Sequence, residues 1–125
     1  MKITTFNPLI VSTDPEPIIQ LFEELGFERH HTKKQIGDHK VTDVRMKDPN
    51  GFYVDVAQGD GNWTIIRINV DNFEEAVAFF MDHGFRKPRH EQASKTTDTG
   101  SSKFTMLVSP TGFIINISEH LKDRD

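Results

Sequence analysis

The sequence predicts an α+β protein built from two βαβββ modules, and three observations predict it. A turn and strand over residues 48–56 (DPNGFYVDV) recur over residues 109–117 (SPTGFIINI). A helical pattern that ends in Gly and Phe precedes each copy, at Gly26-Phe27 and at Gly84-Phe85. Between the copies, residues 63–70 alternate in the period of two that is typical of a strand. The chain therefore contains one supersecondary unit twice.

A single βαβββ module has one helix, which covers only one face of its sheet. Two modules side by side predict an eight-stranded curved mixed sheet with the helices on the convex face and a cleft between the modules. We expect one domain over residues 1–125, with module 1 over about residues 1–58 and module 2 over about residues 62–120.

The expected strands contain alternating residues or β-branched and aromatic runs. They cover residues 3–11, 27–32, 41–46, 52–56, 63–70, 103–108 and 113–118, and the segment 85–90 completes the second module. Polar loops are predicted over residues 33–40 and 91–102. In both tight turns Pro fixes φ, and the Gly two residues later takes a positive φ.

Each predicted helix has a start signal and an apolar stripe. Pro15 suits the first position of a helix that ends at Gly26. The stripe of this helix consists of Ile18, Leu21, Phe22 and Leu25. Asn72, with the Asp before it, caps a second helix over residues 73–83, and Gly84 ends it. Its stripe consists of Phe73, Val77, Phe80 and Met81.

Composition excludes several function classes. The chain has no Cys, so thiol catalysis and Cys-ligated metals are excluded. The net charge is −4 with acids and bases interspersed, which does not suit a nucleic-acid partner. No signal-peptide pattern and no apolar run of about 20 residues are present, so we expect a cytoplasmic protein without a membrane partner.

The segments LIVSTDP (9–15), LFEELGF (21–27) and DPNGFYVDV (48–56), with their repeats, resemble the vicinal-oxygen-chelate superfamily, also called the glyoxalase/bleomycin-resistance/dioxygenase family. The resemblance covers nearly the whole chain. It implies the paired βαβββ fold and a homodimer. It does not imply one activity, because the family includes isomerases, lyases, dioxygenases, epimerases and metal-free drug-binding proteins.

In the metal-using members, a ligand lies on the first strand of each module and a Glu lies on the last strand, four residues after the turn Gly. The corresponding positions here are Phe6, Asp55, Ile65 and Asn116. A shift of one residue would place Asn7 or Thr64 on the first strands instead. Only Asp55 is a strong ligand, whereas a divalent cation needs about three to six donors. We therefore expect no metal and no cofactor.

Strand alternation places further polar residues on the predicted cleft face. Asp55 faces with Tyr53, opposite to Val54 and Val56. Arg67, whose guanidinium can hold a carboxylate or phosphate, faces with Asn69. The candidate ligand contacts are Tyr53, Asp55, Arg67, Asn69, Asn116, Phe6, Ile65 and Trp63. The alternatives are an ion pair between Asp55 and an Arg such as Arg67, and a Trp63 that packs over the seam between modules.

The sequence therefore predicts a metal-independent protein that binds an apolar or aromatic small molecule in the inter-module cleft. The alternative is a metal-dependent lyase, isomerase or dioxygenase whose displaced metal site uses Asp55 with His39 and either His30 or His31. A third interpretation is an interaction module whose cleft is filled by side chains.

Overall fold

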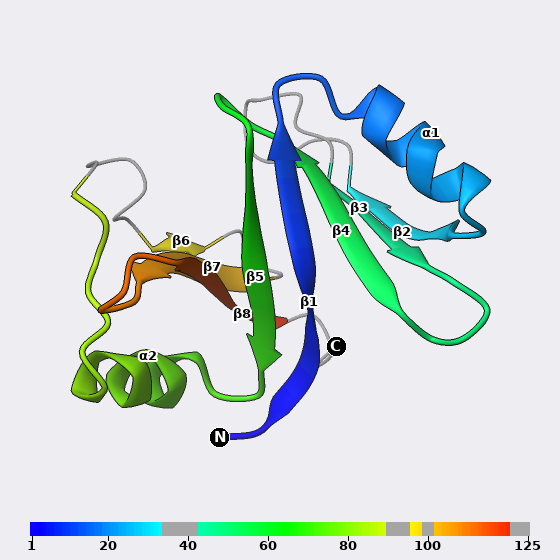
Figure 1. The fold of residues 1–125 in the computed structure, drawn as a ribbon. Coiled ribbons are helices and arrows are strands. Elements are labelled where there is room, and N and C mark those ends of the chain that lie inside the picture. The colour runs from blue at the N-terminus through cyan, green and yellow to red at the C-terminus, as the bar shows by residue number, and fades with distance from the viewer. Residues whose placement is uncertain (34–42, 90–95, 99–101, 121–125) are drawn as a thin grey trace. The chain divides into compact units, whose positions relative to one another are not determined.

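The computed structural model describes residues 1–33, 43–89, 96–98 and 102–120, and these form an α+β fold with mixed β-sheet and two helices (Figure 1). The chain divides into two compact units. One comprises Asn7–Ile65 and is called the 7–65 unit here. The other comprises Ile66–Asp125 together with Met1–Phe6 and is called the 66–125 unit.

The helices are α1 (Glu16–Glu24) and α2 (Phe73–Asp82). The strands are β1 (Ile3–Ser12), β2 (Glu28–Lys33), β3 (Asp43–Lys47), β4 (Tyr53–Gln58), β5 (Trp63–Val70), β6 (Thr97–Asp98), β7 (Ser102–Val108) and β8 (Ile114–His120). Apart from β6, the strand bounds lie within 2 residues of the predicted ones. In the described part of the chain, no helix has the length and apolar character that a membrane span needs.

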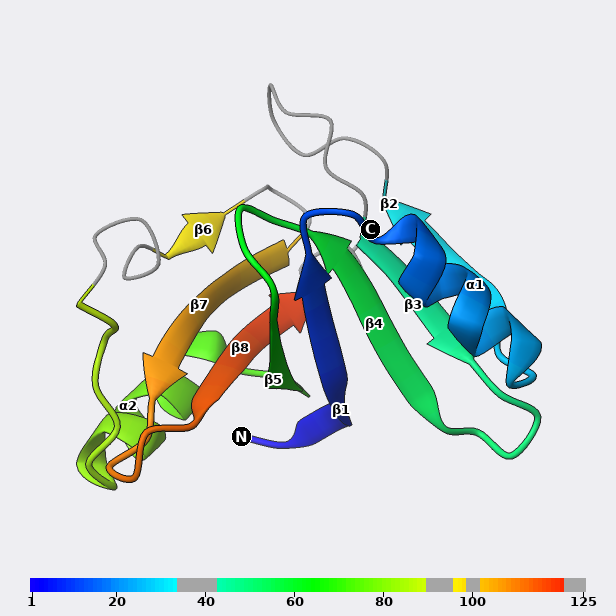
Figure 2. The same cartoon turned by 45° about the horizontal axis from the view of Figure 1, so that its top comes forward.

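In the 7–65 unit the strand order is β2-β3-β4-β1. β3 is antiparallel to both of its neighbours, and β1 is parallel to β4. α1 lies along one face of these strands (Figure 2). The core between helix and strands contains Ile19, Val44, Met46, Val54 and Val56. Among the described residues of this unit, no helix lies on the opposite face of the sheet, which is called the helix-free face here.

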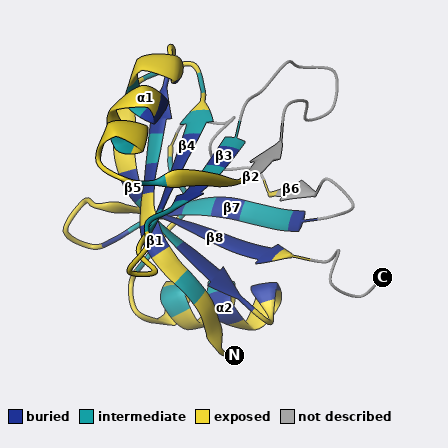
Figure 3. Cartoon of the chain, turned by 90° about the vertical axis from the view of Figure 1, so that its right-hand side faces the viewer, coloured by how far each residue is buried: buried dark blue, intermediate teal, exposed yellow. Residues whose placement is uncertain are grey.

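The apolar stripe of α1 differs from the predicted one. Ile19 is fully buried, and Ile18 and Phe22 pack beside it. Leu21 and Leu25 are instead 54% and 64% exposed. Both stripes have helical spacing, so the periodicity alone does not choose between them. The direction in which the helix meets the sheet selects the stripe centred on Ile19. Figure 3 shows the exposed outer side of α1.

In the 66–125 unit the strand order is β5-β8-β7-β6, with β8 parallel to β5 and antiparallel to β7. Residues 3–6 of β1 also belong to this unit. The predicted stripe of α2 is confirmed at Phe73, Val77 and Phe80. Met81 is 45% exposed, and the smaller Ala76 is buried in its place. The buried core consists of Ile68, Val70, Phe73, Ala76, Leu107, Ile115 and Ile117.

The segment 85–90 does not form the strand that the repeat predicts. Among its described residues, Arg86 makes one isolated antiparallel bridge with Val108. Pro88 follows, which has no backbone N–H to donate to a neighbouring strand. The outer strand of this unit is β6, which lies inside the predicted loop over residues 91–102 and pairs with β7.

The two predicted turn glycines are confirmed. Gly51 has a φ of +90° and Gly112 a φ of +103°. In each turn the Gly donates its N–H to the carbonyl three residues earlier, Asp48 or Ser109. The left-handed conformation that Gly allows lets the chain reverse directly into β4 and β8. Each turn therefore sets the register of the strand that carries a candidate site residue.

Candidate functional site

The helix-free face of the 7–65 unit carries a polar group that begins with Asp55. Val54 and Val56 pack into the core beneath α1, so Tyr53 and Asp55 lie on the other face of β4. The register of β3 against β4 places Arg45 opposite Asp55 and Lys47 opposite Tyr53. Two strands thus bring one acid, one phenol and two cations together.

Asp55 and Arg45 form a two-pronged ion pair. Nε and Nη2 of Arg45 donate to the two carboxylate oxygens of Asp55, each at 2.8 Å. Nη2 also donates to Oδ1 of Asn7 on β1 at 3.2 Å. The Asp55 side chain is fully buried, and that of Arg45 is 16% exposed. The hydrogen bond to Asp55 raises the pKa of Arg45 above the usual arginine value, against the lowering effect of burial.

Tyr53 lies among three basic side chains. The guanidinium carbon of Arg45 is 5.2 Å from the centre of the Tyr53 ring, and Nζ of Lys47 is 5.5 Å from it. Both distances lie within the range of a cation–π interaction. The His30 ring meets the Tyr53 ring edge-on, with the ring centres 6.1 Å apart. The aromatic ring is therefore held in an electropositive setting.

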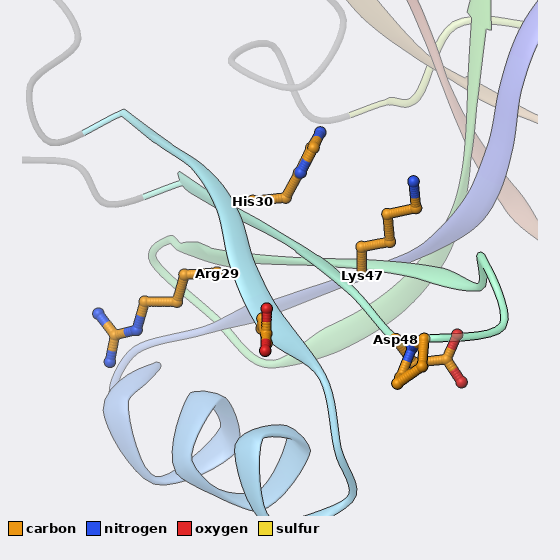
Figure 4. A pocket seen from close by; sticks show the side chains of 6 residues that line it. Arg29, His30, Lys47 and Asp48 are labelled. Atoms are coloured by element: carbon orange, nitrogen blue, oxygen red, sulfur yellow. The ribbon is translucent and has the colours of Figure 1, made fainter.

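A pocket of about 270 Å³ lies at the ends of β2 and β3 in the same unit. Its lining residues are Glu28, Arg29, His30, Lys47, Asp48 and Pro49. Figure 4 shows His30 and Lys47 extending on one side of the strand pair, whereas Arg29 points toward α1. Arg29 forms ion pairs there with Glu16 at 3.0 Å and with Glu23 at 3.2 Å. The hydrogen bond to Glu23 raises the pKa of Arg29.

The face of the 66–125 unit that lies opposite α2 carries a second polar group. The core packing of Ile68 and Val70 confirms the alternation of β5, which turns Arg67 and Asn69 to the other face. Nε of Arg67 donates to Oδ1 of Asn116 at 3.3 Å across the parallel pair β5–β8. Ser118 Oγ donates to the same oxygen at 2.5 Å. The structure therefore brings Arg67 and Asn116 together.

Asn69 and Phe6 lie in different surroundings within this unit. Asn69 is buried and donates from Nδ2 to Oγ1 of Thr5, so the amide ties residues 1–6 to β5. Phe6, the next residue along β1, is 64% exposed. Asn69 thus has a structural partner, and Phe6 presents an open apolar ring.

Trp63 and Ile65 belong to the 7–65 unit. Trp63 is half exposed, and a Cβ added at Gly61 would meet its indole ring. Ile65 is 4% exposed. No described contact joins either residue to Tyr53 or Asp55, so their place in a ligand site stays a prediction.

Sequence reasoning missed Arg45 and Lys47. The signal that marks them is the alternation of β3, because Arg45 stands between Val44 and Met46, which are both fully buried. A cation between two core residues of a strand must lie on the opposite face. From the sequence, His30 is predicted only as a possible metal ligand. The side chain of His31, and the whole of His39, lie outside the described residues.

Comparisons with known proteins place the fold. No protein-family model matches the chain, and no curated protein matches it. Solved structures do match. Methylmalonyl-CoA epimerase from Mycobacterium tuberculosis superposes with a TM-score of 0.67 at 13% identity, over 98% of this chain and 91% of that one.

Two further structures agree with this result. Glyoxalase I from Zea mays gives a TM-score of 0.65 at 12% identity, over 94% of this chain and 43% of that one. A glyoxalase/bleomycin resistance protein/dioxygenase superfamily member from Vibrio splendidus 12B01 gives 0.59 at 15% identity, over 94% and 99%. The chain has the vicinal-oxygen-chelate fold. At these identities the likeness concerns the fold alone.

Some proteins with the vicinal-oxygen-chelate fold hold a metal ion on these strands. The residues at the corresponding positions of this chain do not fit a metal ion. Both carboxylate oxygens of Asp55 accept hydrogen bonds from Arg45, and a guanidinium repels a divalent cation at this distance. Asn116 likewise has Arg67 as its neighbour. Within the described ranges, His, Asp and Glu side chains nowhere gather in a group of three that could hold a metal ion.

Proposed function

We propose that this protein of the vicinal-oxygen-chelate fold binds a small organic molecule with an apolar or aromatic part, without a metal ion. One observation carries the proposal. Asp55, on the last strand of the first module, is buried in a two-pronged ion pair with Arg45. At the position where metal-using relatives place a ligand, this chain has a neutralised pair instead.

The surroundings of this pair support ligand binding rather than chelation. Tyr53 is only partly buried and offers a rigid aromatic surface beside the pair. In the 66–125 unit, considered by itself, Arg67 and Asn116 form a separate hydrogen-bonding pair. Small-molecule sites typically combine such apolar surfaces with a few fixed polar groups. Arg45 of the ion pair lies against the Tyr53 ring and so helps to fix the position of this aromatic surface.

The test begins with protein that has been treated with a chelator and freed of it. A library of aromatic compounds is screened by thermal shift, with and without added Zn²⁺, Ni²⁺ or Mn²⁺. A ligand at a hundred times its Kd should stabilise the protein by about 2.7 kcal/mol, and the metals should not change this. A hit whose binding disappears after chelation and returns with one metal would contradict the proposal.

Variants then locate the site. Tyr53→Leu removes the aromatic surface, and Arg67→Ala removes the guanidinium beside Asn116. The matched control is Arg86→Ala, because Arg86 is exposed and its described contacts are backbone hydrogen bonds with Val108. We expect Tyr53→Leu to weaken the binding of hits at least tenfold and the control to leave it unchanged. Equal affinities in all of these variants would refute the site.

The eight-stranded curved sheet and the homodimer expected from the sequence remain predictions within this proposal. Light scattering on the purified protein tests the homodimer directly. A mass of 14.3 kDa over the whole concentration range would show a monomer and remove that part of the proposal.

A further inference from the structure

His30 lies at a β-bulge and faces Tyr53. The pairing of β2 with β3 shifts register between Arg29 and His31, so His30 is the extra residue with no partner opposite it. Its neighbour Arg29 stands opposite the core residue Met46 and reaches toward α1. The imidazole of this residue contacts the Tyr53 ring in a T-shaped arrangement.

Lys47 supplies a positive charge at the same place. Its register partner on β2 is Glu28, which is exposed, but its ammonium lies over the Tyr53 ring. Among the described residues Lys47 forms no ion pair. Arg45 lies over the same ring at 5.2 Å, so two cations share one aromatic partner.

Three of the other charged side chains around the pocket have described partners. Arg45 is neutralised by Asp55, and Arg29 is neutralised by two glutamates of α1. The Asp48 carboxylate accepts the N–H groups of Asn50 and Phe52 within its own turn. The Lys47 ammonium and the His30 imidazole are therefore the donors that the pocket offers to a ligand.

We propose that the pocket at the ends of β2 and β3 binds the anionic group, a carboxylate or a phosphate, of an aromatic ligand. Lys47 and His30 donate to the anion, and the Tyr53 ring packs against the aromatic part. This inference rests on the proposed function, since it names the class of ligand that the site takes.

The test uses Tyr53, which is the single tyrosine of the chain. Protein with ¹³C-labelled tyrosine gives one set of ring signals, and these are followed during titration with benzoate, phenyl phosphate and neutral benzamide. We expect both anions to shift these signals and to bind about tenfold more tightly than benzamide, as a charge-assisted hydrogen bond predicts.

Variants separate the charge from the ring. Lys47→Met should weaken both anions about tenfold and leave benzamide unchanged, and Lys47→Arg should retain most of the anion affinity. Glu28→Gln should tighten anion binding, because it removes a carboxylate from the pocket lining. The matched control is Lys2→Met, since Lys2 is an exposed lysine of the 66–125 unit.

The outcomes also separate this inference from the proposed function. Equal affinity for benzoate and benzamide, or a Lys47→Met variant that behaves like the Lys2→Met control, would overturn the anion site and leave small-molecule binding standing. If none of these compounds and none of the screened library binds, both proposals fail.

Discussion

Removing Arg45 from its buried partner gives the most direct test of how this sheet face is built. The substitution Arg45→Leu leaves an apolar side chain in place of the aliphatic part of Arg45. It deletes the two N–H donors that hold the Asp55 carboxylate at 2.8 Å. Asp55 is fully buried, so its carboxylate cannot simply turn to water. The variant leaves a buried charge without its principal described partner.

The expected loss follows from the burial of the two side chains. Breaking a buried ion pair from one side costs about 3–5 kcal/mol. We expect about 3 kcal/mol, the lower end, because the Arg45 side chain is 16% exposed and water can enter the space that it leaves. For a chain of this length, that loss lowers the Tm by roughly 10 °C.

The assay is urea unfolding followed by circular dichroism, on wild type, both single variants and the double variant Arg45→Leu/Asp55→Leu. Replacing the whole pair with apolar residues should recover most of the stability, to within about 1 kcal/mol of wild type. The interaction free energy then comes from the double-mutant cycle. An unfolding free energy of Arg45→Leu within about 0.5 kcal/mol of wild type would refute the reasoning. Strictly additive effects of the two substitutions in the double variant would also refute it.

The same pair has a defined pH dependence on its arginine side. Asp55 raises the folded-state pKa of Arg45, so this stabilisation is complete below the usual arginine pKa. It is lost only as the pH rises through the raised value. The difference in unfolding free energy between wild type and Arg45→Leu should therefore be equal at neutral and at mildly alkaline pH. A clear decline between those two conditions would contradict this assignment.

Three further substitutions test the fold by the same urea assay. Ile19→Ala should cost about 3 kcal/mol because this side chain of α1 is fully buried against the sheet, and a loss below about 1 kcal/mol would argue against that core. Asn72→Ala should cost about 1 kcal/mol, since its Oδ1 accepts an N–H of the first turn of α2; an unchanged midpoint would contradict the cap. Gly84→Ala should cost more than Gly26→Ala. Both glycines have positive φ, but a Cβ at Gly84 would lie 2.9 Å from Pro110 whereas nothing lies within 4 Å at Gly26. Equal losses would show that the contact is relieved without cost.

The sequence by itself determined the order of the elements and the identity of the strand faces. Period-two alternation is a local property, so it correctly predicted that Asp55 and Val54 lie on opposite faces of their strand. It likewise predicted that Arg67 and Ile68 lie on opposite faces of theirs. The turn glycines were predictable for the same reason, because the conformation of Gly51 depends only on its own turn.

Tertiary structure decided which residues meet. The Arg45–Asp55 pair depends on the register of β3 against β4, and His30 depends on a bulge that one strand cannot reveal alone. The stripe of α1 likewise depends on which side of the helix meets the sheet, so Ile19 is buried and Leu25 is not. The physical reason is range: backbone preferences act between neighbours in the chain, whereas register and packing bring together residues of different elements.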